Sequence, residues 1–211
     1  MAGIWSAAAW CEVTRRGDDV TPVLETSRLL LRPVTLDDAP AAQALFAHWD
    51  IVRYLRDIVP WPYPADGTYT FYRDVLFPNM EAGKSLGWAV IERASGQFAG
   101  LLELCPHDDE DNRGFWIGLP FQQKGYVTEA VTATTDYAFD VLGMTKLRLN
   151  NAAANIGSHR IKEKAGATLV EITEGEFVAG TLPKEIWELT PDAWRASPMK
   201  RAAPNPSYIL R

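Results

Sequence analysis

A hydrophobic strand, a short loop with one glycine and the start of an amphipathic helix follow one another directly over residues 115–130. At the start of a helix, unpaired backbone N–H groups and the positive end of the helix dipole point toward the same place. A glycine in the preceding loop lets the backbone approach an anion closely. This order of elements predicts a binding site for a phosphate-bearing ligand around Gly125.

Two common phosphate-binding loops do not fit this segment. A P-loop requires Gly-x-x-x-x-Gly-Lys-Ser/Thr, and the chain contains no such run. A dinucleotide-binding fingerprint requires three glycines, whereas Gly125 stands alone. A nucleotide-binding protein that uses the same loop is therefore a less favoured interpretation, because a lysine–serine pair for metal-bound phosphates is missing.

The rest of the chain alternates between the period of strands and the period of helices. Expected strands cover residues 29–33, 86–92, 98–104, 114–119, 146–150, 168–172 and 185–189, and expected helices cover 41–49, 66–78, 130–141 and 156–165. Short turns between the second, third and fourth strands predict antiparallel pairing. The strand–helix–strand order over residues 115–150 predicts a βαβ unit. The expected fold class is α/β, with a mixed, mostly antiparallel central sheet flanked by helices and one domain.

Composition divides the chain into three parts. Residues 1–22 lack a basic start and a continuous apolar run, so we interpret them as an N-terminal extension rather than a signal peptide. Residues 23–197 form the expected domain. Residues 198–211 are rich in proline and basic at their start, which predicts a tail rather than packed structure.

Charge and cysteine content exclude several classes of function. A formal net charge of -6 argues against general nucleic-acid binding, which needs a basic surface. No apolar run reaches the length of a membrane span. Two cysteines, Cys11 and Cys105, do not make a disulfide framework and suit a reducing cytoplasm. Neither has metal-ligand spacing with a histidine, so we predict no metal site.

Three segments together resemble the GNAT acetyltransferase superfamily. Gln122, Gly125 and Val127 fall on the fixed positions of its motif A, Gln/Arg-x-x-Gly-x-Gly/Ala. Residues 24–33 resemble the opening strand of its ribosomal-protein-alanine N-acetyltransferase branch, and residues 155–160 with 163–167 resemble the second signature of that branch. The resemblance covers roughly residues 23–195. Val127 departs from the pattern, and its two extra methyl groups predict a shifted or weakened pyrophosphate site.

The resemblance implies that acetyl-CoA is the co-substrate. Its pyrophosphate would be held by backbone N–H groups of the loop, and its pantetheine arm would lie between two splayed parallel strands. The residues that the resemblance places at this cofactor are Phe115, Trp116, Ile117, Gln122, Gln123, Lys124, Gly125, Tyr126, Val127, Thr128 and Asn155. The expected reaction is N-acetylation of a primary amine. A protein N-terminus is the nearest suggestion, and a small molecule or a lysine side chain is also compatible, as is a homodimer.

The proton-transfer groups are predicted less sharply. Many related enzymes protonate the leaving thiolate with a tyrosine seven residues after the asparagine, but Lys162 stands there. Ser158 therefore takes that role by default, although a serine in the first turn of a helix also has a purely structural use. Glu103 is the nearest strand carboxylate for a general base, and the acidic run 108–111 is a second candidate. Asn112 stands where related sequences often carry glutamate.

Two expectations remain open in the sequence. Trp61, Tyr63 and Tyr69 belong to the segment that walls the acceptor pocket in similar proteins, although aromatic residues beside prolines also serve packing. The missing tyrosine and the missing strand glutamate leave an alternative from another class of protein. This alternative is a non-catalytic acyl-CoA-binding sensor or regulatory module.

Overall fold

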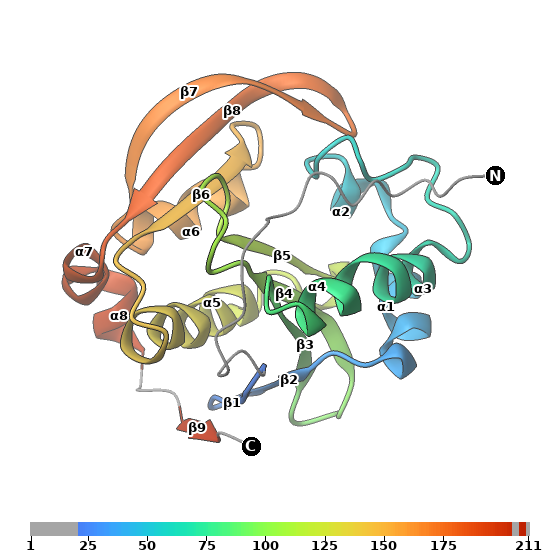
Figure 1. The fold of residues 1–211 in the computed structure, drawn as a ribbon, viewed down its shortest axis with the longest axis horizontal. Coiled ribbons are helices and arrows are strands. Elements are labelled where there is room, and N and C mark those ends of the chain that lie inside the picture. The colour runs from blue at the N-terminus through green and yellow to red at the C-terminus, as the bar shows by residue number, and fades with distance from the viewer. Residues whose placement is uncertain (1–20, 204–206, 210–211) are drawn as a thin grey trace.

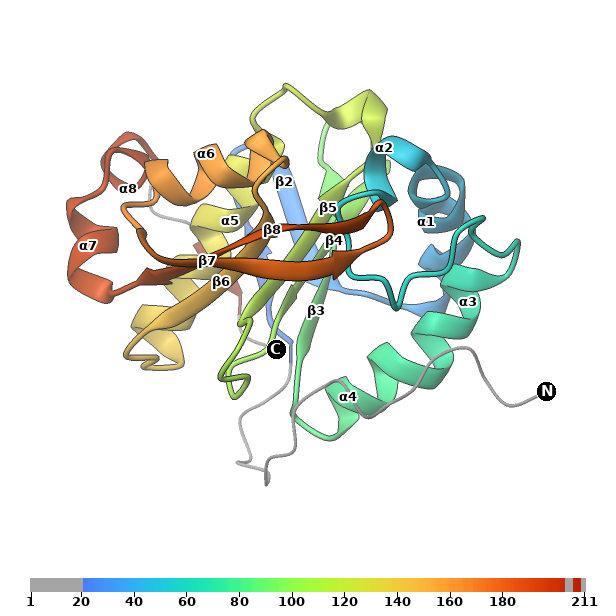
Figure 2. The same cartoon turned by 90° about the horizontal axis from the view of Figure 1, so that it is seen from above.

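The computed structural model describes residues 21–203 and 207–209. Its strands form a 6-stranded sheet in the order β5-β4-β3-β2-β1-β9 and a 3-stranded sheet in the order β6-β8-β7 (Figures 1 and 2). All pairings within these two sheets are antiparallel. The strands are β1 Val23–Glu25, β2 Leu29–Pro33, β3 Leu86–Glu92, β4 Phe98–Leu104, β5 Arg113–Ile117, β6 Leu147–Ala152, β7 Thr168–Phe177, β8 Gly180–Leu189 and β9 Ser207–Ile209.

The helices gather in two groups at opposite ends of the molecule (Figure 2). The first group is α1 Ala39–Phe46, α2 Trp49–Val52, α3 Gly67–Phe71 and α4 Phe77–Glu81, and the second is α5 Tyr126–Asp136, α6 Ile156–Lys164, α7 Pro191–Ala196 and α8 Pro198–Ala202. The α/β fold with mostly antiparallel strands and flanking helices is therefore confirmed. The strands lie in two sheets, because no ladder joins β5 to β6 in the described part of the chain.

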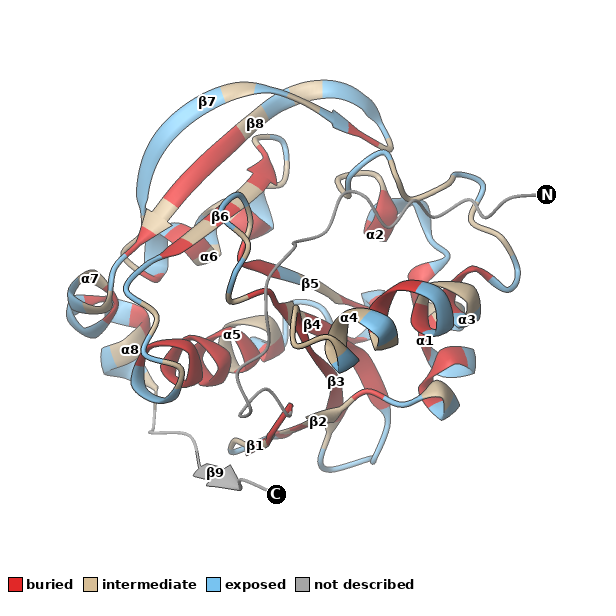
Figure 3. Cartoon of the chain, viewed as in Figure 1, coloured by how far each residue is buried: buried red, intermediate tan, exposed pale blue. Residues whose placement is uncertain are grey.

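The larger sheet is buried on both faces. Along β3, Trp88 and Val90 enter the core cluster that contains α5, whereas Ala89 and Ile91 enter the cluster that contains α1. This alternation follows from the two-residue period of a strand. Figure 3 shows the opposite situation at the outer edge of the smaller sheet, where β7 is largely exposed and β8 is not. The fold thus has one central layer of strands with helices on both faces.

Several boundaries differ from the sequence-based expectation for physical reasons. The helix expected over residues 66–78 continues to Glu81. Pro78 has no backbone N–H to donate, and the wide π-type turn Tyr72–Leu76 just before it changes the hydrogen-bond pattern, so the helix can continue past the proline. The strand expected over 114–119 ends at Ile117, since Pro120 lies in the 3-10 turn Leu119–Phe121. The helix expected over 41–49 divides into α1 and α2 at residues 47–48.

The expectation of an unpacked C-terminal tail is wrong for residues 198–203. Helix α8 begins at Pro198, and Met199 is buried in the main core. The Lys200 ammonium lies 2.8 Å from the buried Asp136 carboxylate at the end of α5, which also accepts a 2.9 Å hydrogen bond from the Trp194 indole. Further on, β9 pairs with β1. The extension expected over residues 1–22 lies outside the described residues, apart from Thr21 and Pro22.

One buried asparagine joins the two sheets. The Asn112 backbone N–H donates to the Arg148 carbonyl of β6 (2.8 Å), and its side-chain oxygen accepts from the Arg148 N–H (2.6 Å). Its side-chain amide donates to the carbonyls of Cys105 and Asp108, at 3.0 and 2.6 Å. Because Asn112 precedes β5 and Arg148 is near the start of β6, the two strands begin side by side and run in the same direction, as the βαβ interpretation predicts.

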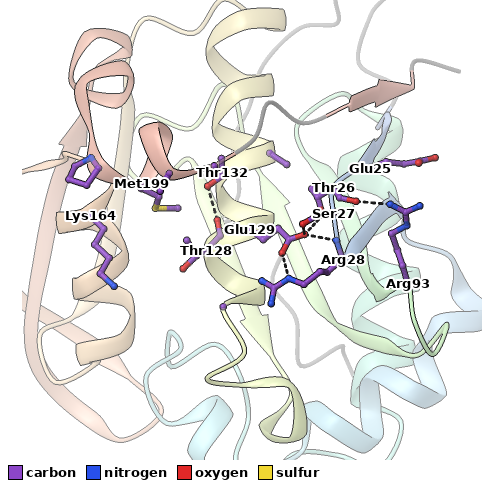
Figure 4. A pocket seen from close by; sticks show the side chains of 15 residues that line it. Glu25, Thr26, Ser27, Arg28, Arg93, Thr128, Glu129, Thr132, Lys164 and Met199 are labelled. Carbon is purple, nitrogen blue, oxygen red and sulfur yellow. Dashed lines mark hydrogen bonds and ion pairs between the residues drawn. The ribbon is translucent and has the colours of Figure 1, made fainter.

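A single carboxylate attaches the start of α5 to the turn between β1 and β2 (Figure 4). Glu129 accepts hydrogen bonds from Thr26 Oγ1 (2.5 Å), Ser27 Oγ (3.1 Å) and the backbone N–H of Arg28 (2.8 Å). The Arg28 guanidinium pairs with it at 2.7 Å and also donates to the Lys124 carbonyl. Burial opposes ionisation of Glu129, but the hydrogen bonds from Thr26 and Arg28 outweigh it, so the pKa of this carboxyl lies below its usual value.

Replacing Asn112 with Ala should destabilise the protein by roughly 2–4 kcal/mol, because the Asp108 carbonyl and the Arg148 N–H lose their hydrogen bonds to the side chain, and the Cys105 carbonyl keeps only its bond from the Asp108 N–H. Urea denaturation of the purified variant measures this loss. The matched control is Asn150→Ala, which removes one exposed hydrogen bond to Glu110 and should cost less than about 1 kcal/mol. Equal midpoints for the two variants would contradict the role given to Asn112.

Replacing Glu129 with Gln should lower stability by roughly 1–3 kcal/mol near neutral pH, because hydrogen bonds to a charged acceptor are lost. The folded-state pKa of Glu129 is depressed, so its contribution is present above the unfolded pKa and is lost as pH falls through the folded pKa. Denaturation curves of both proteins should therefore converge in acid. Asp74→Asn, which alters an exposed ion pair with Arg73, is the control, and its stability should stay close to that of the unmodified protein.

Candidate functional site

The loop before α5 presents a row of unpaired backbone donors. Gly125 caps the helix in the left-handed conformation (φ 79°), and Gln123 also has a positive φ of 60°. The first bond of the helix runs from the Glu129 N–H to the Gly125 carbonyl. In residues 21–203 and 207–209, no acceptor meets the backbone N–H groups of residues 123–128. A left-handed turn followed by a helix start is a suitable geometry for binding a phosphate.

Three side chains of this loop and the start of α5 contact other parts of the protein. Gln122 donates to the Ile117 carbonyl (3.1 Å), and the Tyr126 hydroxyl hydrogen-bonds to Glu92. Val127 is half-buried and packs against the main core. Its methyl groups thus have a packing partner within the protein, and the expected shift or weakening of a pyrophosphate site stays a prediction. Gln123, Lys124 and Gly125 are exposed, and Thr128 is half-buried.

A cavity of about 900 Å³ lies between β5, β6 and the first group of helices. Phe115, Trp116 and Asn155 line it, together with residues 149–151 of β6. The Gly118 N–H donates to the Ala99 carbonyl, and the Cys105 N–H donates to the Asn112 carbonyl. In an antiparallel pair every second residue is hydrogen-bonded to the partner strand, so the backbones of Gly114 and Trp116 also pair with β4. The backbones of Phe115 and Ile117 consequently face the open edge toward β6, although the Ile117 carbonyl already accepts from Gln122.

Glu103 enters this cavity from β4. The sequence allowed it to be a solvent-facing residue of an alternating strand, but it is half-buried and opposite Gly114 of β5. Burial raises the pKa of Glu103 to about 7, with Asp108 adding to the effect. A carboxyl group that titrates near neutral pH can act as a general base.

The acidic run 108–111 divides into two parts. Asp109 and Glu110 are exposed, as a solvated loop predicts, whereas Asp108 and Asp111 are half-buried. Asp111 accepts from the backbone N–H of Asn150 at 3.3 Å. Its pKa is raised by burial, with Lys162 opposing that shift. The part of the run that reaches the cavity wall is thus tied to β6 rather than free to move in solvent.

At the other wall, Asn155 and Lys162 line the cavity, and Ser158 lies directly beside Lys162 on α6. Asn155 caps the helix by accepting from the Ser158 N–H at 3.1 Å, so its structural role is real. Ser158 is 9% exposed and Lys162 is 3% exposed. The Lys162 ammonium nitrogen donates to Ser158 Oγ at 2.7 Å. The sequence identified Lys162 only as a missing tyrosine, although the i, i+4 spacing from Ser158 already predicted that the two share one helix face.

The prolyl loop and the tip of the β7–β8 hairpin build a further side of the cavity. Tyr63 lines the cavity and packs edge-on against Phe46, with ring centroids 4.8 Å apart. Trp61 is 43% exposed and lies against Trp49, so it does not pack in the core, and Tyr69 is 44% exposed. The hairpin tip holds the segment after α2 through bonds from Val178 and Ala179 to the carbonyls of Leu55 and Arg53, both 3.0 Å.

A second hollow, of about 770 Å³, lies beside the start of α5 (Figure 4). Gly125 and Thr128 border it, with Arg28 and Lys164 nearby. The structure therefore divides the predicted site: Glu103, Phe115, Trp116 and Asn155 meet at the first cavity, and the loop residues lie outside it. Among the described residues, no group of three or more His, Cys, Asp or Glu side chains could hold a metal ion, and no helix is long and apolar enough to cross a membrane.

Sequence comparison identifies one family along most of this core. The model of the acetyltransferase (GNAT) domain matches residues 28–168. The N-acetyltransferase YoaA of Bacillus subtilis, which is uncharacterized, is 25% identical over 150 residues, covering 69% of this chain and 82% of that protein.

Solved structures share the fold at low sequence identity. Mycobacterium smegmatis RimJ in complex with CoA-disulfide has a TM-score of 0.73 at 15% identity, covering 87% of this chain and 94% of that one. The ribosomal-protein-S5-alanine acetyltransferase of Vibrio fischeri has a TM-score of 0.67 at 12% identity, covering 82% and 98% of the two chains. With the family model spanning the βαβ unit, the phosphate loop and the cap of α6, this chain belongs to the GNAT acetyltransferase family.

Proposed function

We propose that this protein transfers an acetyl group from acetyl-CoA to a primary amine, with a protein N-terminus as the preferred acceptor. The observation that carries the proposal is the cavity between the diverging strands β5 and β6, which has a half-buried Glu103 on one wall and Lys162, hydrogen-bonded to Ser158, on the other. The ribosomal-protein acetyltransferase among the structural neighbours supports the choice of acceptor.

The residues present fit acetyl-CoA in two respects. The unpaired N–H groups of residues 123–128 suit a pyrophosphate, because they supply donors without requiring side-chain charge. The open backbone edge at Phe115 suits an amide-bearing arm, which would continue the sheet as an added strand. When bound, acetyl-CoA supplies an activated carbonyl, and the N–H groups along β5 would orient it.

The protein's own contribution to the reaction is positioning and proton transfer. Glu103 would accept the proton that the acceptor amine loses on attack, since its pKa of about 7 matches that task near neutral pH. Ser158 would face the departing sulfur from α6. The walls formed by Tyr63 and Trp116 would exclude water from the acceptor side.

The first test is calorimetric titration with acetyl-CoA, followed by free-thiol release with a panel of peptides and small amines. We expect binding, and thiol release with a peptide that has a free N-terminus but not with its N-terminally blocked form. Gly125→Ala should weaken binding by about tenfold or more, because a Cβ in the left-handed conformation forces the loop to shift. The matched control is Gly96→Ala, which adds a Cβ at a similar φ of 69° in open space.

Three outcomes of this test separate the alternatives. Binding with thiol release establishes the enzyme and identifies its acceptor class. Binding without release for any acceptor would favour the acyl-CoA-binding sensor, and no binding at all would reject the cofactor assignment.

A second test concerns the general base. Replacing Glu103 with Gln should lower kcat/KM by about 100-fold or more, because a positioned base is lost. In the unmodified protein, kcat/KM should rise with pH through about 7 as Glu103 loses its proton, and this rise should be absent in the variant. Glu171→Gln, which changes an exposed carboxylate of β7 outside the cavity, serves as the control. A variant with an unchanged pH profile would exclude Glu103 as the base.

A further inference from the structure

Lys162 is a buried lysine at the wall of the larger cavity. It projects from α6 four residues after Ser158, and its nitrogen donates to Ser158 Oγ at 2.7 Å. Because the lysine is the donor in this contact, the hydroxyl hydrogen of Ser158 remains available to a different acceptor. The Asn155 cap fixes the first turn of the helix beneath this pair. The two side chains therefore form a short chain of donors, of which Lys162 lines the cavity.

The surroundings of Lys162 stabilise its positive charge only weakly. No carboxylate of the described residues lies within 4 Å of its nitrogen, although Asp111 from the loop before β5 and Glu185 from β8 attract it at longer range. Arg113 of β5 repels it. Burial lowers the pKa of Lys162, Asp111 opposes this shift, and Arg113 adds to it. A lysine in such an environment can release and recover a proton near neutral pH.

A purely structural lysine would be an expensive choice here. A buried cation costs free energy unless it is closely paired, and an apolar side chain would fill the same space without that cost. The nearby Arg113 guanidinium is itself 5% exposed, and two of its nitrogens lack partners in the described structure. Two cations thus share one neighbouring carboxylate at the cavity wall, an arrangement that favours a ligand atom that becomes negative during the reaction.

We propose that Lys162 supplies, through Ser158, the proton that the departing sulfur of CoA takes up. This inference rests on the proposed function. The amine nitrogen forms a bond to the carbonyl carbon, the carbon–sulfur bond breaks, and its electron pair goes to sulfur. Sulfur takes the Ser158 hydroxyl proton while the Lys162 ammonium donates one to Ser158 Oγ, which leaves neutral lysine. The proton lost by the amine passes to Glu103 and returns through solvent to Lys162, so the protein ends unchanged.

Product CoA alone is sufficient to test the electrostatic part of this proposal. The thiolate absorbance of bound CoA is followed against pH in the unmodified protein and in Lys162→Gln, which keeps a donor for Ser158 but removes the charge. We expect the thiol pKa of bound CoA to be about 1–3 units lower in the unmodified protein, because a nearby cation stabilises the thiolate. The control is Lys146→Gln, which removes an exposed lysine paired with Glu188 and should leave the thiol pKa unchanged.

Lys162→Arg separates charge from proton transfer. It should keep the lowered thiol pKa but reduce kcat by about tenfold or more, because a guanidinium does not release its proton. Equal thiol pKa values in the unmodified protein and Lys162→Gln, with CoA bound to both, would overturn the role of Lys162 and leave acetyl transfer intact. If the unmodified protein does not bind CoA, the proposed function itself is rejected, and the role of Lys162 is rejected with it.

Discussion

The arrangement of the whole site depends on how Asn112 joins two sheets that otherwise do not pair. Its backbone and side chain both bind Arg148 at the start of β6, and its amide also holds the carbonyls of the acidic loop. Beyond that point the edges of β5 and β6 separate. An open pair of strand edges inside a protein would normally be filled by a further strand. Here the separation leaves backbone groups facing a cavity, which is the space that an extended ligand arm needs.

The fold could be predicted to a large extent because local signals agreed with one another. The alternation along β3 and β4, the glycine before α5 and the stop at Gly143 each pointed to the element that the structure contains. The resemblance implied splayed strands, but the junction between the two sheets could not be predicted, because it depends on a contact between Asn112 and Arg148, which are distant in sequence. The packed C-terminus was missed for a similar reason. Proline and basic residues suggested a tail, but Lys200 has a buried partner that no local pattern reveals.

The sequence predicted which residues belong to the candidate site better than it predicted their contacts and environment. The sequence predicted a phosphate site at the loop around Gly125, and the structure adds that the backbone N–H groups of this loop lack partners within the described chain. Val127 illustrates the limit, since the direction of its side chain depends on how α5 is rotated against the core. Lys162 illustrates another limit. A lysine in place of tyrosine suggested a lost group, whereas burial and the hydroxyl of Ser158 give that lysine a different environment from one in solvent.

The carboxylate at the end of α5 has a consequence for how the chain folds during synthesis. Asp136 is 1% exposed, and its partners Trp194 and Lys200 both lie close to the C-terminus. A growing chain that has released α5 but not α7 and α8 lacks the two donors that this carboxylate has among the described residues, so burying it would be costly. The final packing of α5 therefore requires that residues 194–200 have been synthesised as well.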